Sequence, residues 1–181
     1  MQGEARHMQN LDYIKQVHLN DIPWRRLSTP YDRADKFPEW FRQLTGDEQD
    51  RADIAAHEIA LNIEHQSTLW QATPFAMIIL GRILTSAIDK YIYTKEEDDI
   101  AAIKRILEIY VPVFETVRFM DEIDHDPPLP HFSDMLNPKY LIPEDLEAFY
   151  DKLDMDFEDM ENDEEDLLEI FLEEFYMEIP G

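Results

Sequence analysis

The sequence contains no cysteine, and this absence excludes several kinds of chemistry. None of its 181 residues can form a disulfide, supply a thiolate to a metal or act as a cysteine nucleophile. A reducing compartment is the natural setting for such a chain, so we expect a cytoplasmic protein. Residues 1–20 mix charged and polar side chains and lack the apolar stretch of a signal peptide. One interpretation of residues 1–7 is an expression-vector remnant, in which case Met8 would be the native start.

Glycine and long uninterrupted apolar runs are also scarce. With only 4 glycines and few stretches that alternate apolar with polar residues, the chain favours helices over sheet. The longest apolar stretch, residues 75–92, is interrupted by Arg82, Asp89 and Lys90, and we interpret it as a buried helix rather than a membrane span. Apolar residues still make up 44 % of the chain, which is enough for the core of one domain.

Basic residues are few, and this imbalance is the strongest compositional signal. There are 41 Asp and Glu residues against 16 Lys and Arg, a net charge of −25. Residues 121–181 hold 22 of the acidic residues and 2 of the basic ones. Such a field repels nucleic acid and anionic membranes and attracts basic surfaces. We therefore expect neither nucleic acid nor membrane as a direct partner, and the concentration in the last third favours a binding role over solubility alone.

Helix-start signals divide residues 1–120, which we expect to form the body of the fold. Thr45–Glu48 and Thr94–Glu97 both have capping-box spacing, in which a threonine oxygen and a glutamate carboxylate each accept a bond from a free N–H group. Thr73 and Pro74 mark a third start, with proline at the first helical position. The segment before Thr45 is rich in turn signals, apart from a short helix start at residues 37–41.

Each predicted helix of the body carries apolar residues at helical spacing. The helix that starts at Thr73 is apolar nearly all round, which predicts a place at the centre of the core. Pro112 predicts a kink in the helix that starts at Thr94. The faces are Ala52, Ala55, Ala56, Ile59 and Ile63; then Phe75, Ile78, Ile79, Ile83, Ala87 and Tyr91, with Leu80, Leu84 and Ile88 beside them; then Ile100, Ile103, Leu107, Tyr110 and Phe114. The aromatic side chains of the turn-rich segment are expected to cap the end of this core: Trp24, Tyr31, Phe37, Trp40 and Phe41.

Two further segments follow the body. Residues 121–142 predict a stiff connector, because Pro127, Pro128 and Pro130 prevent a continuous helix. Residues 143–181 predict acidic amphipathic helices that pack on the body as part of the same domain. Their apolar stripes are Leu146, Phe149, Tyr150, Leu153, Phe157 and Met160, and then, after a cap at Asn162 and Glu165, Leu167, Leu168, Phe171, Leu172 and Phe175.

Consecutive antiparallel helices with short links predict an all-α fold, either an antiparallel helical-hairpin (HEAT-like) repeat or a helical bundle. Residues 62–76 resemble a pattern of bacterial HEAT-like repeat proteins, in which a helix end is followed by His-Gln-Gly-Thr, an aromatic residue, Ala-Thr and an apolar helix. The matching positions are His65, Gln66, Thr68, Trp70, Ala72 and Thr73. Ser67 replaces the glycine of the pattern, and Met77-Ile78-Ile79 replaces its Pro-Phe-Leu.

This resemblance covers about one helical pair, and it implies a function as well as a fold. Some proteins of this kind resemble immunity proteins that neutralise polymorphic toxins, and many such toxins act on nucleic acids and carry basic clefts. A small, acidic, cysteine-free helical protein suits that role.

Patterns of catalytic and metal sites are incomplete in this sequence. Residues 57–61 have leucine where the zinc-protease motif requires its second histidine, and His57 and His65 are two helical turns apart. The carboxylates of residues 154–159 lack the glycine of a calcium loop. We therefore expect no catalytic residue, metal or cofactor. We expect His65 and Gln66 to bond backbone groups in the turn between two helices.

The favoured hypothesis is an immunity or inhibitor protein that occludes the basic active-site cleft of a toxin domain, with a nuclease preferred. One alternative is a nucleic-acid mimic that sequesters a DNA- or RNA-binding protein. The other is a metal-dependent hydrolase that uses the clustered carboxylates. The expected partner contacts are acidic residues with three aromatic anchors: Glu147, Asp151, Asp154, Asp156, Glu158, Asp159, Glu161, Asp163, Glu164, Tyr150, Phe157 and Tyr176.

Overall fold

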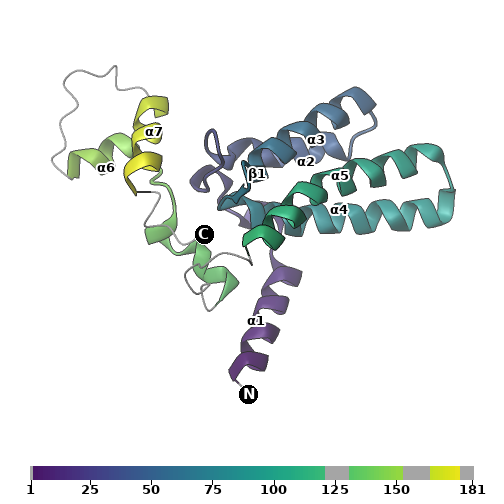
Figure 1. Ribbon diagram of the computed structural model, residues 1–181, viewed down its shortest axis with the longest axis horizontal. Coiled ribbons are helices and arrows are strands. Elements are labelled where there is room, and N and C mark those ends of the chain that lie inside the picture. Colours follow the sequence, from purple (N-terminus) through teal and green to yellow (C-terminus); the bar gives the residue numbers. More distant parts are fainter. Residues whose placement is uncertain (1, 121–130, 153–163, 176–181) are drawn as a thin grey trace.

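A computed structural model describes residues 2–120, 131–152 and 164–175 of the chain. These residues are largely helical and include one small hairpin of strands β1 (Glu64–His65) and β2 (Thr68–Leu69), as Figure 1 shows. The prediction of an all-α fold is confirmed.

Four helices form most of the body: α2 (Phe37–Leu44), α3 (Gln49–Ile63), α4 (Ala72–Thr94) and α5 (Glu97–Met120). Arg105 Nε of α5 donates to Asp53 Oδ1 of α3 at 2.6 Å, and Thr116 Oγ1 donates to Glu64 Oε1 at 3.2 Å. Both pairs are 52 residues apart, so α3 and α5 run parallel to each other. The intervening α4 runs antiparallel to both (Figure 1).

The predicted apolar face of α3 is buried, and all of its residues except Ala52 belong to the main core. Ala52, Ala55, Ala56, Ile59 and Ile63 are all buried, as the spacing predicts. The aromatic cap also forms: the rings of Trp24 and Phe37 stack with their centroids 5.3 Å apart, and Phe41 packs against both. Tyr31 is the exception, because 58 % of it is exposed.

Helix α1 (Gln2–Gln16) was not expected from the sequence. The Arg82 guanidinium on α4 holds its C-terminal end by donating to the carbonyls of Val17 at 2.5 Å and Ile14 at 2.6 Å. This explains why a charged residue interrupts the apolar stretch of α4. Three short 3₁₀ helices, at Leu19–Asp21, Trp24–Arg26 and Ala34–Lys36, account for the turn signals that follow.

Neither predicted capping box forms. The Thr45 hydroxyl donates to the carbonyls of Phe41 and Arg42 at 3.1 Å, so Thr45 ends α2, and α3 begins at Gln49. Thr94 is the last residue of α4, and its hydroxyl donates to the Lys90 carbonyl at 3.2 Å. The N–H group that this hydroxyl accepts, at 3.4 Å, is that of Glu96 and not that of Glu97 as the box requires. The physical reason is that the carbonyls left free at the end of one helix compete for the same hydroxyl as the N–H groups of the next.

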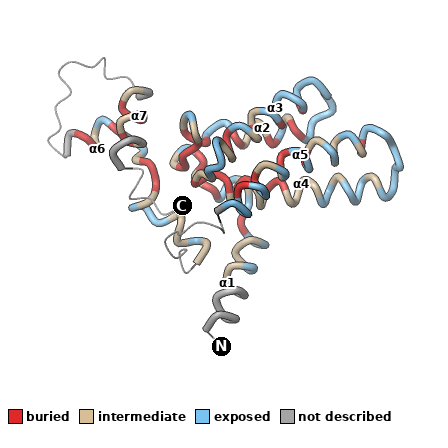
Figure 2. The backbone as a smooth tube through the Cα atoms, in the orientation of Figure 1, coloured by how far each residue is buried: buried red, intermediate tan, exposed pale blue. Residues whose placement is uncertain are grey.

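Only the first half of α4 is central to the core. It has 23 residues against 15 in α3, so it extends about 12 Å beyond that helix. The overhang is visible at the right of Figures 1 and 2, and Ile88, Ile92 and Tyr93 within it are 40 %, 55 % and 89 % exposed. By length and composition α4 could cross a membrane, but the core helix of a soluble protein meets the same criteria.

The expected connector is partly a component of the body. Residues 131–141 form two short 3₁₀ helices, Phe132–Leu136 and Pro138–Tyr140, and the Phe132 ring meets the buried Phe75 ring edge-on at 5.2 Å. Leu141 belongs to the main core. Residues 121–130, with their three prolines, lie outside the described residues. Pro112 lies within α5, which continues past it to Met120.

Two short helices follow the body: α6 (Leu146–Lys152) and α7 (Glu164–Phe175). Their buried side chains form a second cluster with Ile142, separate from the main core, and Figure 2 shows the two buried regions apart. We call residues 142–152 and 164–175 the C-terminal lobe, and residues 2–120 and 131–141 the body. The members of the second cluster are Ile142, Leu146, Tyr150, Leu167, Leu168 and Phe171. The predicted apolar stripes of both acidic helices are therefore correct where described, and Leu153, Phe157, Met160 and Asn162 lie outside the described residues.

Candidate functional site

The C-terminal lobe carries the described part of the predicted acidic surface. Its residues include ten acidic and one basic, whereas the body is nearly balanced. Glu147 is exposed in the first turn of α6, and Glu169 is exposed on α7. Asp145 caps α6 by accepting a bond from the N–H of Ala148 at 2.8 Å. The carboxylates therefore line the outside of a small helical pair whose apolar residues face each other.

Several predicted contact residues are not placed by the described structure. Asp151 and Glu164 lie within helices, but their side chains are not described. The others lie outside the described residues: Asp154, Asp156, Phe157, Glu158, Asp159, Glu161, Asp163 and Tyr176.

Tyr150 was expected to be an aromatic anchor for a partner, but in the structure it is buried inside the lobe. It is only 2 % exposed, and its hydroxyl donates to the carbonyl of Leu167 at 3.3 Å. The ring of Phe149 packs edge-on against it and against Phe171. Tyr150 therefore joins α6 to α7, because its ring supplies apolar contact and its hydroxyl satisfies a carbonyl of the other helix.

A polar joint connects the lobe to the body. Arg26 Nε donates to the carbonyl of Ile142 at 3.0 Å, and the Ile142 N–H donates to the carbonyl of Arg26 at 2.9 Å. Arg33 Nη1 donates both to the carbonyl of Arg25 at 2.9 Å and to that of Pro143 at 3.1 Å. Arg33 is 6 % exposed, so its charged group is held in a buried position by backbone oxygens.

Gln71 extends this joint from the start of α4. Its amide nitrogen donates to the carbonyl of Tyr140 at 2.5 Å, and its amide oxygen accepts bonds from the N–H and hydroxyl of Ser28 at 3.3 Å. The joint thus ties three distant parts of the sequence together. Periodicity cannot reveal it, because its acceptors at residues 140, 142 and 143 are main-chain atoms.

The β1–β2 hairpin is a second candidate surface. Gln66 and Ser67 at its tip have φ angles of 51° and 61°, in the left-handed region that favours glycine. Ser67 stands where the pattern that the sequence resembles has glycine, and it adopts this left-handed conformation as a serine. Glu64 Oε1 supports the turn by accepting a bond from the Ser67 N–H at 2.9 Å.

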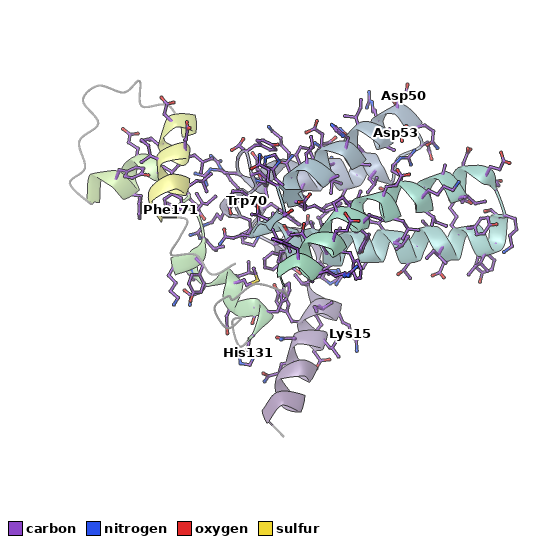
Figure 3. The ribbon with its side chains drawn as sticks, viewed as in Figure 1. Lys15, Asp50, Asp53, Trp70, His131 and Phe171 are labelled. Carbon is purple, nitrogen blue, oxygen red and sulfur yellow. The ribbon has the colours of Figure 1, made fainter. Side chains whose placement is uncertain are left out.

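The His65 side chain was expected to bond to a backbone group, but it contacts another side chain instead. Its Nδ1 lies 3.0 Å from the hydroxyl of Tyr31, a residue whose part in this surface the sequence did not indicate. Thr68 makes the backbone bond instead, by donating its hydroxyl to the His65 carbonyl at 2.6 Å. An exposed tyrosine, a histidine and a strained turn thus share one end of the body near Trp70, which Figure 3 labels.

The tip of the α4–α5 hairpin is closed by a buried carboxylate. Asp99 accepts a 2.7 Å ion pair from Lys90 and a hydrogen bond from the Thr94 hydroxyl. These contacts, of which the bond from Lys90 is the stronger, hold the pKa of Asp99 below its usual value of 3.8. This accounts for Asp99 being buried on an otherwise exposed acidic turn.

An exposed apolar face on α5 escaped the sequence reasoning, which placed Leu107 and Phe114 on the inner face. Of the twelve large apolar side chains exposed among the described residues, five lie on α5 between residues 107 and 119. They are Leu107, Val111, Phe114, Val117 and Phe119. A shallow groove of about 420 Å³ beside them is lined by Leu107, Tyr110, Val111, Phe114, Glu115 and Arg118.

Among the described residues, no group of three or more His, Asp or Glu side chains converges in a way that could hold a metal ion. Comparisons with protein-family models, with curated proteins and with solved structures give no match.

Proposed function

We propose that this protein is an immunity or inhibitor protein that binds a bacterial toxin domain in the cytoplasm through its acidic C-terminal lobe. The proposal is of binding rather than catalysis. Its partner would be a domain with a basic surface, and a nuclease or another toxin that acts on nucleic acid fits best, because such enzymes bind polyanions in basic clefts.

One observation carries the proposal: the negative charge is concentrated on a small unit with its own apolar cluster. Tyr150, Leu168 and Phe171 occupy the inside of this unit, which leaves the outside to carboxylates such as Glu147 and Glu169. Acidity that served only solubility would not require a separate unit. A compact acidic unit presented at one end of the molecule offers a basic cleft a surface of opposite charge.

Inhibition would act by occlusion. Carboxylates of the lobe would occupy the positions of substrate phosphates, and their field would accelerate the encounter with the toxin. Because Tyr150 is committed to the lobe core, the aromatic anchors of this proposal are Phe157 and Tyr176. The joint at Arg26 and Arg33 would hold the lobe in a fixed orientation and so reduce the entropy lost on binding.

The test uses the product of the adjacent open reading frame, which this proposal predicts to be the toxin domain. We expect Glu144→Lys, Glu147→Lys and Glu169→Lys, combined in one variant, to slow association by roughly tenfold or more at low salt. Association of the wild type should slow as salt rises, since the screening length falls to about 8 Å near 0.15 M. Stopped-flow association rates across a salt series measure both effects, and toxin activity in the same mixtures measures inhibition.

A matched control keeps the change in net charge the same. Asp50→Lys, Asp89→Lys and Glu97→Lys alter three exposed acidic residues of the body, and Asp50 lies toward the end of α3 that is remote from the lobe (Figure 3). The proposal requires the association rate to fall further in the lobe variant than in the control variant. Equal rates for the two variants, with both folded by circular dichroism, would show that the lobe is only a solvated surface. Displacement of DNA from unrelated proteins would instead favour the nucleic-acid mimic.

A further inference from the structure

Three of the exposed apolar side chains of α5 form a continuous stripe. Leu107, Val111 and Phe114 are spaced by four and then three residues, so they lie on one side of the helix. They are 46 %, 55 % and 64 % exposed. The opposite side of α5 is already used, because Ile106, Ile109 and Val113 are buried in the main core. A second apolar stripe on a helix that already packs through its first one indicates a second packing partner.

The charges around this stripe are unlike those of the rest of the chain. Residues 103–119 contain three basic and two acidic residues, although the whole chain has a net charge of −25. Arg118 and Glu115 line the groove itself. Glu108 and Lys104 are exposed on the same helix. The stripe is therefore a surface where another acidic molecule can approach without strong repulsion.

We propose that this stripe is the contact between two copies of the protein, with the α5 helices antiparallel across a two-fold axis. A register centred between residues 112 and 113 brings Val111 opposite the partner subunit's Phe114 and Leu107 opposite the partner subunit's Arg118. Arg118 then lies between Glu115 of its own helix and the partner subunit's Glu108. Each apolar side chain meets an apolar side chain or an aliphatic stem, and each Arg118 has carboxylates on both sides.

The area available sets the strength of this contact. Counting the exposed parts of the three stripe residues in both copies, together with the neighbouring side chains that line the groove, the contact buries on the order of 1,000 Å². This lies at the lower end of specific interfaces, so the dimer forms at micromolar concentrations rather than nanomolar ones. Because both copies carry a net charge of −25, their overall repulsion opposes the contact and is screened by salt. Dimerisation should therefore strengthen as salt rises, which is the opposite of the salt dependence proposed for the acidic lobe.

Sedimentation equilibrium of the full chain tests the proposal, from micromolar to submillimolar protein and from 0.05 to 0.5 M NaCl. We expect a monomer–dimer equilibrium whose dissociation constant falls with salt. The variant with Val111→Glu and Phe114→Glu should have a dissociation constant raised by about tenfold or more. The matched control is Ile88→Glu with Ile92→Glu, which places the same charges on the exposed apolar residues of α4 and should dimerise like the wild type. Circular dichroism establishes that each variant is folded.

A charge exchange tests the register. Arg118→Glu alone should weaken the dimer, because it brings together carboxylates from both copies, and adding Glu108→Arg should restore it. A chain that stays monomeric at 0.5 M NaCl would overturn the proposal, and so would equal weakening by the α4 variant. Failure of Glu108→Arg to rescue Arg118→Glu would reject this register. These measurements contain no toxin, so their outcome is independent of the proposed inhibitory function.

Discussion

The body and the C-terminal lobe are both helical, but they differ in how they are stabilised. Among the described residues, the main core joins 21 buried side chains from many parts of the sequence, whereas the cluster of the lobe has six. The lobe also has ten acidic residues and only one basic residue on a small surface, so its negative charges repel one another. Small cores of this kind give marginal stability. The lobe should therefore open more readily than the body and depend on its joint to the body.

The largest effect should come from the aromatic core of the body. Phe37 is fully buried and stacks on Trp24, so Phe37→Ala should lower the free energy of unfolding by about 3–5 kcal/mol. The corresponding change in the lobe is Phe171→Ala. All three tryptophans lie in the body, so tryptophan fluorescence during urea unfolding follows the body alone, while circular dichroism follows both units. Phe171→Ala should reduce helicity and leave the fluorescence transition unchanged. A shift of that transition would mean that the two units unfold as one.

A smaller effect is expected at the joint. Arg33→Leu leaves the carbonyls of Arg25 and Pro143 without their donor, at a cost of about 2–3 kcal/mol. Amide exchange over residues 142–150 should accelerate, because the lobe loses a contact with the body. Arg51→Leu is the control: its guanidinium pairs with Glu48 at the surface, and its loss should be nearly neutral. Unchanged exchange in Arg33→Leu would show that the lobe holds its place by other contacts.

Within the lobe, Tyr150→Phe isolates a single hydrogen bond. The ring remains packed and only the bond to the Leu167 carbonyl is lost, so we expect a loss of about 1 kcal/mol. Because the effect is local, amides of α7 should exchange faster while those of α3 keep their rates. Faster exchange in α3 would contradict the separation of the two units.

The β1–β2 hairpin offers a change that stabilises the body. Ser67→Gly relieves a left-handed backbone conformation, and we expect a gain of about 0.5–1 kcal/mol in the free energy of unfolding. The same substitution in a helix, Ser86→Gly in α4, should instead destabilise by a similar amount. Thermal unfolding of both variants shows whether each substitution raises or lowers stability. A loss of stability in Ser67→Gly would show that the serine side chain stabilises the hairpin by more than the left-handed conformation destabilises it.

The smallest effect concerns pH and the tip of the α4–α5 hairpin, because Lys90 is largely exposed and water screens its charge. The pKa of Asp99 is lowered in the folded protein, so its contribution is present above its ordinary value of 3.8 and is lost as pH falls through the folded value. The difference in stability between wild type and Asp99→Asn should therefore be present at pH 7 and shrink below pH 3.8. Urea unfolding at several pH values measures this difference, and a gap that persists in acid would exclude the ion pair as its source.

The sequence predicts helix faces in this protein better than helix ends. The spacing of Ala52, Ile59 and Ile63 identifies a buried face, because apolar periodicity reports directly on which side meets the core. The Thr45 capping box fails because a short link offers its hydroxyl to two helices at once, and the preceding one binds it. The relative lengths of the helices matter too. Because α4 extends past α3, residues predicted to be in the core, such as Ile88, are exposed to water.

The candidate surfaces also contain features that the sequence predicts and features that it does not. The apolar stripe containing Tyr150 could be predicted, but its burial in a separate cluster depends on where α7 packs. Leu107 was assigned to the inner face of α5, since a helix with two apolar stripes gives no local sign of which one faces the core. Arg82 and Arg33 act on carbonyls more than 60 residues away, and such contacts leave no periodic trace in the sequence.

The joint between the units has a consequence for how this protein can diverge. Arg26 and Arg33 bind the main-chain oxygens of residues 142 and 143, which every amino acid possesses. The side chains of the lobe can therefore be exchanged through mutation while the attachment to the body is kept. Lineages that retain the two arginines would carry lobes of altered surface on one unchanged scaffold, and new partner preferences would require no redesign of the body.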